Sequence, residues 1–200
     1  MRKIGALIAL VVMVGSAAAE GPSKAKSGIG YREDGPKDLV DAIKARRANG
    51  KLLNLDRMLL NSPAFAKGWN AMFGAIRGQL AVPAKLRELS IMAIGALNSA
   101  DYEWAQHEQE FLKAGGSKDQ LAALKNPGAA LKNAKLFDET ERATLALVNE
   151  MTKNVKVEAA TMARIRKALP DDQVVELIGT IAGYNMVSRF VVATGVEIEP

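Results

Sequence analysis

Apolar residues along this chain recur every three or four positions, and no segment alternates strictly between apolar and polar residues. The clearest case is the segment 64–80, where five large side chains follow this spacing: Phe65, Trp69, Met72, Phe73 and Ile76. Such a spacing puts apolar residues on one face of a helix, whereas strands require a period of two. The pattern therefore predicts an all-α protein with this aromatic face in its core.

Proline, glycine and capping residues divide the chain into further helices. Pro36 precedes the first apolar helix and Pro83 precedes another, while Gly50 and the pair Gly115-Gly116 follow helix ends. The expected helices after position 36 span about 38–49, 64–80, 84–97, 101–114, 117–124, 138–153, 157–169 and 172–194. No internal repeat is visible, so we predict one helical-bundle domain over residues 36–200.

The N-terminus has the three parts of a secretory signal peptide. Positive residues Arg2 and Lys3 precede an apolar stretch, which ends in small residues up to Ala19. The apolar stretch is shorter than the roughly 20 residues that span a bilayer, so we expect residues 1–19 to be cleaved rather than to remain as an anchor. Residues 20–35 lack an apolar period and are predicted to be a flexible leader. The mature protein is then periplasmic or extracellular, without stable membrane insertion.

Composition excludes several classes of function. The 200 residues include no cysteine, which rules out a thiol nucleophile, a redox disulfide and a thiolate metal site. Loss of residues 1–19 lowers the formal charge from +5 to +3, because 25 Lys and Arg then face 22 Asp and Glu. A charge this mild and this evenly spread argues against nucleic-acid binding. About 180 residues remain, enough for one sizeable core.

The only histidine is the main candidate for proton chemistry. His107 lies four residues after Glu103, so the two side chains share a helix face. Glu88 lies on the preceding predicted helix, and an antiparallel pairing of the two helices would bring all three groups together. We predict His107 as the acid/base, with one carboxylate orienting its ring and the other raised in pKa by burial. The sequence leaves open which carboxylate does which.

These residues resemble the carboxymuconolactone decarboxylase family, which includes alkylhydroperoxidase D-like proteins. The resemblance covers roughly residues 50 to 198 and rests on three stretches: Pro83 to Leu89, Ala100 to His107 and Tyr184 to Phe190. In the peroxidase branch, a glutamate is followed by Cys-x-x-Cys and a histidine. Here Glu88 and His107 match the glutamate and histidine, whereas Ala100 and Glu103 occupy the two cysteine positions.

The missing cysteines decide between the branches of this family. Thiol peroxidase chemistry requires a thiolate, so it is chemically excluded for this chain. The resemblance then implies the decarboxylase branch: loss of carbon dioxide from a small carboxylated lactone, or its isomerisation, by acid/base groups that Glu88, Glu103 and His107 could supply. It also implies a helical fold and a homotrimer or homohexamer, with a small-molecule substrate and no cofactor.

Other residues are weaker candidates for substrate binding. Arg87 or Arg189 could hold a substrate carboxylate, and Tyr102 or Tyr184 could donate a hydrogen bond to an enolate oxygen. Each has an ordinary structural interpretation, as an ion pair or a buried hydrogen bond.

Two other classes of function also stay open. Glu88, Glu103 and His107 could instead bind a divalent metal, or the domain could be a catalytically silent, oligomeric ligand-binding protein.

Overall fold

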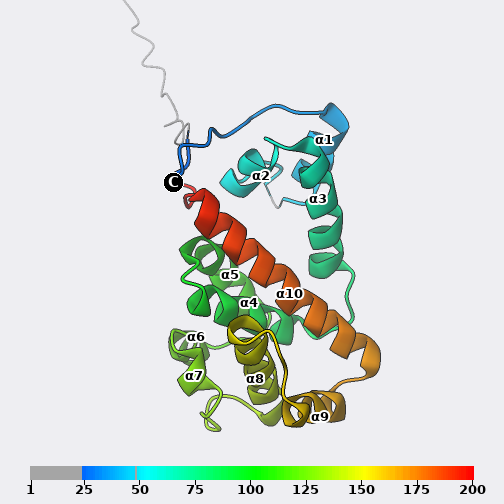
Figure 1. Ribbon diagram of the computed structural model, residues 1–200, viewed down its shortest axis with the longest axis vertical. Helices are drawn as coiled ribbons and strands as arrows, with labels where there is room; N and C mark the ends of the chain where they lie inside the picture. The colour runs from blue at the N-terminus through cyan, green and yellow to red at the C-terminus, as the bar shows by residue number, and fades with distance from the viewer. Residues whose placement is uncertain (1–23, 48) are drawn as a thin grey trace, which may run out of the picture.

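The computed structural model describes residues 24–47 and 49–200, and its described part contains helices but no β-strand (Figure 1). The predicted signal peptide lies outside the described residues. The helices are α1 (Lys37–Ala45), α2 (Asn54–Leu59), α3 (Pro63–Gly78), α4 (Ala84–Leu97), α5 (Asp101–Lys113), α6 (Lys118–Ala123), α7 (Pro127–Ala130), α8 (Glu139–Lys153), α9 (Ala159–Ala168) and α10 (Asp171–Thr194). The all-α prediction is confirmed.

Helix α4 lies at the centre of the bundle. It contacts α5, α8 and α10, and its side chains from Glu88 to Gly95 are all buried. A helix that is apolar nearly all round is stable only inside a protein, and the sequence Leu-Ser-Ile-Met-Ala-Ile of α4 meets that condition. The tight turn at Asn98 and Ser99 then reverses the chain, so α5 runs back along α4 as its antiparallel neighbour. This hairpin carries the predicted acid/base residues.

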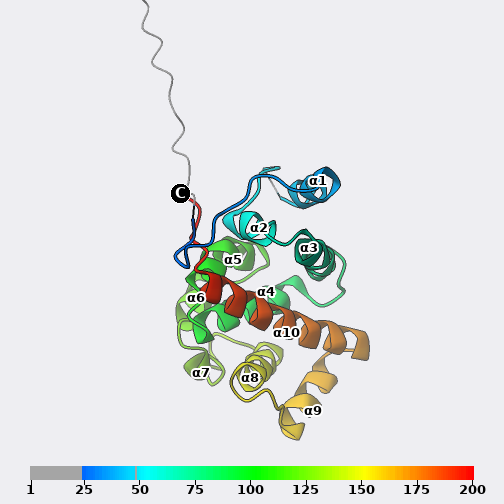
Figure 2. The same cartoon turned by 45° about the horizontal axis from the view of Figure 1, so that its top comes forward.

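The other helices surround this hairpin. The long helix α10 crosses the molecule diagonally and separates the N-terminal helices α1–α3 from α6–α9 (Figures 1 and 2). It contacts α3, α4, α5, α8 and α9, so one continuous element joins both parts of the bundle. The site described below lies on the side where α1–α3 face α5 and α10.

Two short helices were not expected from the sequence. Helix α2 has six residues and α7 has four, too few to show a helical period.

The capping predictions for two other helices are confirmed. Ser117 accepts a hydrogen bond from the backbone N–H of Gln120, and Asp138 accepts one from Glu141. These contacts explain why α6 and α8 begin where the sequence predicts.

The aromatic face of α3 is only partly buried. Trp69, Phe73 and Ile76 lie in the core as expected, but Phe65 is 46% and Met72 is 40% exposed. The prediction that all five side chains lie in the core is therefore wrong for these two. The reason is that α3 flanks the bundle and has few neighbouring helices, so a five-residue stripe is wider than the surface available to cover it.

The segment predicted as a flexible leader packs against the body from Lys24 onward. Lys24 pairs with Gly30 in an isolated bridge, and Ala25 is buried. Helix α10 ends at Thr194, and the left-handed φ of 64° at the following Gly195 turns the chain towards this segment. Tyr31 then accepts a hydrogen bond from the backbone N–H of Glu197 at 3.0 Å. The contact depends on residues 166 positions apart, which no local pattern predicts.

Within the described residues, no helix has the length and apolar character required to cross a bilayer.

Candidate functional site

The α4–α5 hairpin brings Glu88, Glu103 and His107 together, as the sequence predicts. Nδ1 of His107 lies 2.7 Å from Oε2 of Glu88, across the two antiparallel helices. Nε2 of the same ring lies 3.7 Å from Oε2 of Glu103, one turn earlier on α5. All three residues are buried, and His107 is only 3% exposed. An exposed helix-surface pair would not be enclosed in this way.

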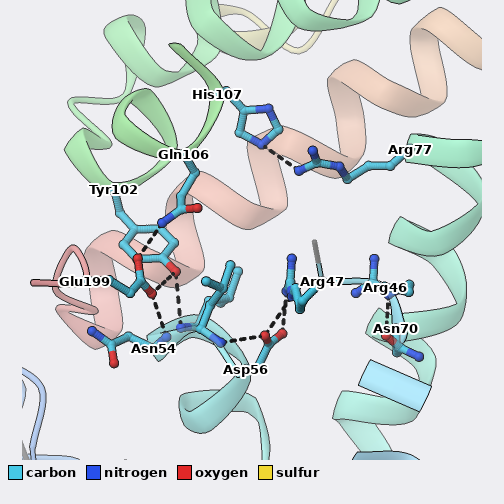
Figure 3. Close-up of polar contacts among 12 residues, drawn as sticks. Arg46, Arg47, Asn54, Asp56, Asn70, Arg77, Tyr102, Gln106, His107 and Glu199 are labelled. Carbon is cyan, nitrogen blue, oxygen red and sulfur yellow. Dashed lines mark hydrogen bonds and ion pairs between the residues drawn. The ribbon is translucent and has the colours of Figure 1, made fainter. Parts of the chain in front are cut away.

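The neighbours of His107 determine which ring nitrogen carries the proton in its neutral form. A carboxylate such as Glu88 can only accept a hydrogen bond, so Nδ1 must donate. On the other side, a guanidinium N–H of Arg77 lies 3.4 Å from Nε2 and can only donate. Both contacts require the same tautomer, with the proton on Nδ1 and a free lone pair on Nε2. Figure 3 shows Arg77 and His107 pointing towards each other.

Glu88 is the carboxylate that orients the ring. Burial would raise its pKa, but the hydrogen bond and charge of His107, with the charges of Arg77 and Arg87, outweigh burial and lower the pKa below its ordinary value. Its second oxygen, Oε1, accepts a hydrogen bond from Nε of Arg87 at 3.2 Å. Glu88 is therefore ionised at neutral pH, with a fixed donor on each oxygen.

Glu103 is in the opposite electrostatic situation. Burial raises its pKa, and the nearby charges of His107, Arg77 and Arg47 only partly offset that effect. Glu103 therefore holds a proton to higher pH than Glu88 does. Two neighbouring carboxyl groups with pKa values moved in opposite directions form the usual arrangement of an acid/base site. The structure thus assigns the orienting role to Glu88, a choice that the sequence left open.

A small pocket of about 40 Å³ opens beside Nε2, lined by the side chains of His107, Glu103, Tyr184, Phe73, Trp69 and Arg77. The Tyr184 ring stands edge-on to the imidazole, with 5.1 Å between the ring centres. Among the described residues, no hydrogen bond joins the Tyr184 hydroxyl to another group, and burial raises its pKa. This hydroxyl is thus a neutral donor available to a bound oxygen atom.

Three arginines at the pocket were missed in the sequence. Arg46 and Arg47 follow the end of α1, and Arg77 lies near the end of α3. Arg47 binds both oxygens of the buried Asp56, with its Nε 2.8 Å from Oδ2. Nε of Arg46 donates to Oδ1 of Asn70 at 2.5 Å. The only local signal is an Arg-Arg pair at a helix end, which is common on protein surfaces.

The other predicted binding residues do not reach the pocket in the same way. Arg87 points its Nε at Glu88 and does not line the pocket, and Arg189 is exposed and bonds to Asn185 of its own helix. Tyr102 does line the pocket, but its hydroxyl already donates to Glu199 at 2.9 Å. Of the four candidates, only Tyr184 has a free polar group facing the pocket.

The geometry around His107 bears on the metal alternative. In the part of the chain that the structure describes, no three His, Asp or Glu side chains form a group that could hold a metal ion. Glu88 approaches Nδ1, whereas Glu103 approaches Nε2 together with the guanidinium of Arg77, whose positive charge opposes a cation there. Metal binding by this trio stays a prediction, which metal analysis of the purified protein tests.

Comparison with solved structures identifies the fold. An uncharacterised peroxidase-related protein from Silicibacter sp. TM1040 is 16% identical with a TM-score of 0.70, covering 82% of this chain and 86% of that one. A peroxidase-related protein from Ralstonia eutropha JMP134, described as an alkylhydroperoxidase AhpD core, is 19% identical with a TM-score of 0.64, covering 82% and 87%. The debrominase Bmp8 in its apo form is 16% identical with a TM-score of 0.66, covering 82% and 87%.

At these identities the likeness shows the fold alone. No curated protein sequence matches the chain. The family model of the carboxymuconolactone decarboxylase family matches residues 63–150, which include Glu88, Glu103 and His107. The match extends from the start of α3 to within α8 and so contains the whole α4–α5 hairpin. Residues 63–150 are thus similar to the carboxymuconolactone decarboxylase family, and the chain that contains them has the alkylhydroperoxidase D-like fold, as the sequence predicts.

Proposed function

We propose that this protein catalyses acid/base decarboxylation or isomerisation of a small carboxylated lactone, with His107 as the proton-transferring group. The observation that carries the proposal is the buried pair of Glu88 and His107, which leaves Nε2 directed at the pocket beside Arg77. A positioned histidine with a free lone pair is suited to take or deliver a proton at carbon.

In the decarboxylation, the bond between the ring carbon and the carboxylate breaks and carbon dioxide leaves. Its electron pair moves into the ring as a dienolate, which then takes one proton at carbon. The proton comes from protonated His107, and Glu103, whose pKa is raised by burial, can restore it across the 3.7 Å that separates its Oε2 from Nε2. Charge is conserved, because the substrate carboxylate and the dienolate each carry one negative charge.

Other pocket residues stabilise that charge. The guanidinium of Arg77 and the free hydroxyl of Tyr184 face the space beside Nε2, where the dienolate oxygen would lie. Fixed donors in a water-poor site favour a developing oxyanion more strongly than water does. Phe73 and Trp69 form an apolar wall suited to a planar, unsaturated ring.

Thiol chemistry is not part of the proposal, because the chain has no cysteine. Two of the solved structures with this fold are described as peroxidase-related and one as a debrominase. A thiolate route to either reaction would lack its nucleophile here. The Glu-His pair, by contrast, needs no sulfur.

The test is turnover of carboxylated lactones by the full chain, followed by carbon dioxide release in D₂O. We expect a product with one solvent-derived deuterium at carbon, and a decrease in kcat of about a hundredfold to ten-thousandfold in His107→Ala. Glu108→Gln, next to the histidine and without a side-chain hydrogen bond or ion pair in the described residues, is the control and should retain activity. Unchanged turnover in a folded His107→Ala variant would refute the mechanism.

Export forms a separate part of the proposal. If residues 1–19 are a signal peptide, the protein recovered from outside the cytoplasm should begin at Glu20. N-terminal sequencing of that protein checks the cleavage site. An intact Met1 on the exported form would refute cleavage without affecting the proposed chemistry.

A further inference from the structure

A second and larger cavity adjoins the acid/base pocket. It has a volume of about 480 Å³ and shares Arg46, Arg47, Leu53, Arg77 and Gln106 with the smaller pocket, so the two lie side by side. Ligand sites generally measure about 300 to 1,000 Å³. The 40 Å³ beside His107 has room for only a few water molecules. A ligand of ordinary size that reaches His107 must therefore extend into the larger cavity, which we call the arginine basin.

The arginine basin has more positive than negative charge. Three guanidinium groups line it, of Arg46, Arg47 and Arg77, against the single carboxylate of Glu110. That carboxylate lies 2.8 Å from the ammonium group of Lys113, which neutralises it. Asp56 neutralises Arg47 through two hydrogen bonds. Across residues 24–47 and 49–200, no carboxylate lies within ion-pair distance of Arg46 or Arg77.

Neither Arg46 nor Arg77 is held in place by an ion pair in the described part of the chain. Arg46 follows the end of α1, where a cation could bind the last carbonyl groups. Its side chain instead donates to Asn70 on α3. Burial lowers the pKa of Arg46, and the charges of Arg47 and Arg77 lower it further, while the charge of Asp56 offsets only part of this effect. Holding like charges together in a half-buried position is unfavourable unless an anion joins them. Figure 3 shows Arg77 above Arg46 and Arg47.

The wall of the arginine basin is also shaped for a ligand. Gly74 and Gly78 lie one turn apart on α3 and line the basin without side chains. A Cβ atom at Gly74 would lie 3.3 Å from Cδ of Arg46, which is tight, so glycine lets this arginine lie against α3. A Cβ atom at Gly78 would meet nothing within 4 Å and would project into open space.

We infer that the arginine basin is a binding site for a small dianion, such as a dicarboxylate or phosphate, held by Arg46 and Arg77. Two guanidinium groups without an ion-pair partner among the described residues match two negative charges, and Arg47 is fixed by Asp56 as a third donor at the wall. Guanidinium groups bind carboxylate and phosphate oxygens through paired N–H donors. The site binds its anion whether or not His107 acts on it, so binding and turnover are separable.

The test is calorimetric titration of the full chain at low salt with succinate, inorganic phosphate and propionate. We expect succinate or phosphate to bind at least about tenfold more tightly than propionate, since one charge-assisted contact contributes at least that factor. Arg46→Gln and Arg77→Gln should each weaken binding by about tenfold or more. The control is Arg164→Gln, an exposed arginine paired with Glu139 in another part of the molecule.

A pair of uncharged variants separates the basin from general charge effects. Gly78→Met should fill the basin and abolish binding, whereas Gly68→Met should not, because Gly68 lies on the same helix, has equal open space and does not line the basin. Equal affinity for propionate and succinate, or binding unaffected by Gly78→Met, would overturn the inference. His107→Ala should retain anion binding, so a failed mechanism and a failed basin give different results.

Discussion

Replacing Glu88 with glutamine tests the tautomer assignment directly. Both oxygens of Glu88 receive hydrogen bonds, Oε1 from Nε of Arg87 at 3.2 Å and Oε2 from Nδ1 of His107 at 2.7 Å. An amide has only one oxygen. If that oxygen stays with Arg87, the amide NH₂ faces Nδ1 and moves the ring proton to Nε2, where it meets the N–H of Arg77. If the amide turns round, its NH₂ faces the N–H of Arg87 instead.

Either orientation loses one charge-assisted hydrogen bond in a buried place. Such a bond contributes about 1.5 to 3 kcal/mol, so Glu88→Gln should lower the free energy of unfolding by about 2 kcal/mol. For a chain of this size, that corresponds to a decrease in melting temperature of about 4 to 8 °C. The loss arises from mismatched donors, since glutamine and glutamate have nearly the same shape.

Nitrogen-15 NMR of the imidazole is the assay, and assignment is simple because His107 is the only histidine. The wild-type ring, in its neutral form, should show the proton on Nδ1, and Glu88→Gln should shift the population towards Nε2. Glu108→Gln provides the matched control for stability and tautomer. A neutral wild-type ring protonated on Nε2, or an Nδ1–H ring unchanged in Glu88→Gln, would refute the reasoning.

Three further predictions follow from the same contacts. Burial raises the pKa of Glu103 above its ordinary value of 4.5, so its contribution to stability is complete at low pH and is lost as pH rises through the folded pKa. The melting temperature of Glu103→Gln should therefore equal that of the wild type near pH 4 and exceed it at pH 8. Equal melting temperatures at both pH values would contradict the burial argument. Tyr184→Phe removes a hydroxyl without a partner, so kcat should fall about a hundredfold with an unchanged melting temperature; steady-state kinetics decide. Glu199 accepts hydrogen bonds from Asn54, Tyr102 and Gln106. Glu199→Ala should therefore lower the free energy of unfolding, measured by urea denaturation, by about 2 kcal/mol. Glu197→Ala is the control and should lower it much less, because the Glu197 side chain makes no such contacts in the described chain.

Local patterns in the sequence determined the helices and the core of this site. The apolar period and the caps at Ser117 and Asp138 depend on residues a few positions apart, and the helices begin where these signals predict. The trio of Glu88, Glu103 and His107 was predictable for the same reason. Two long helices joined by a short turn must lie antiparallel, so their facing residues meet.

Tertiary structure decided the rest of the site. Arg46, Arg47 and Arg77 come from two different helix ends, and they meet only because α1 packs on α3 and both face α5. The opposite pKa shifts of Glu88 and Glu103 depend on which neighbours surround each carboxylate, although both have the same side chain. Helical period and capping depend on residues within one or two turns of each other, so the sequence shows them directly. Burial, charge balance and cavity shape depend on many residues that only the folded chain brings together.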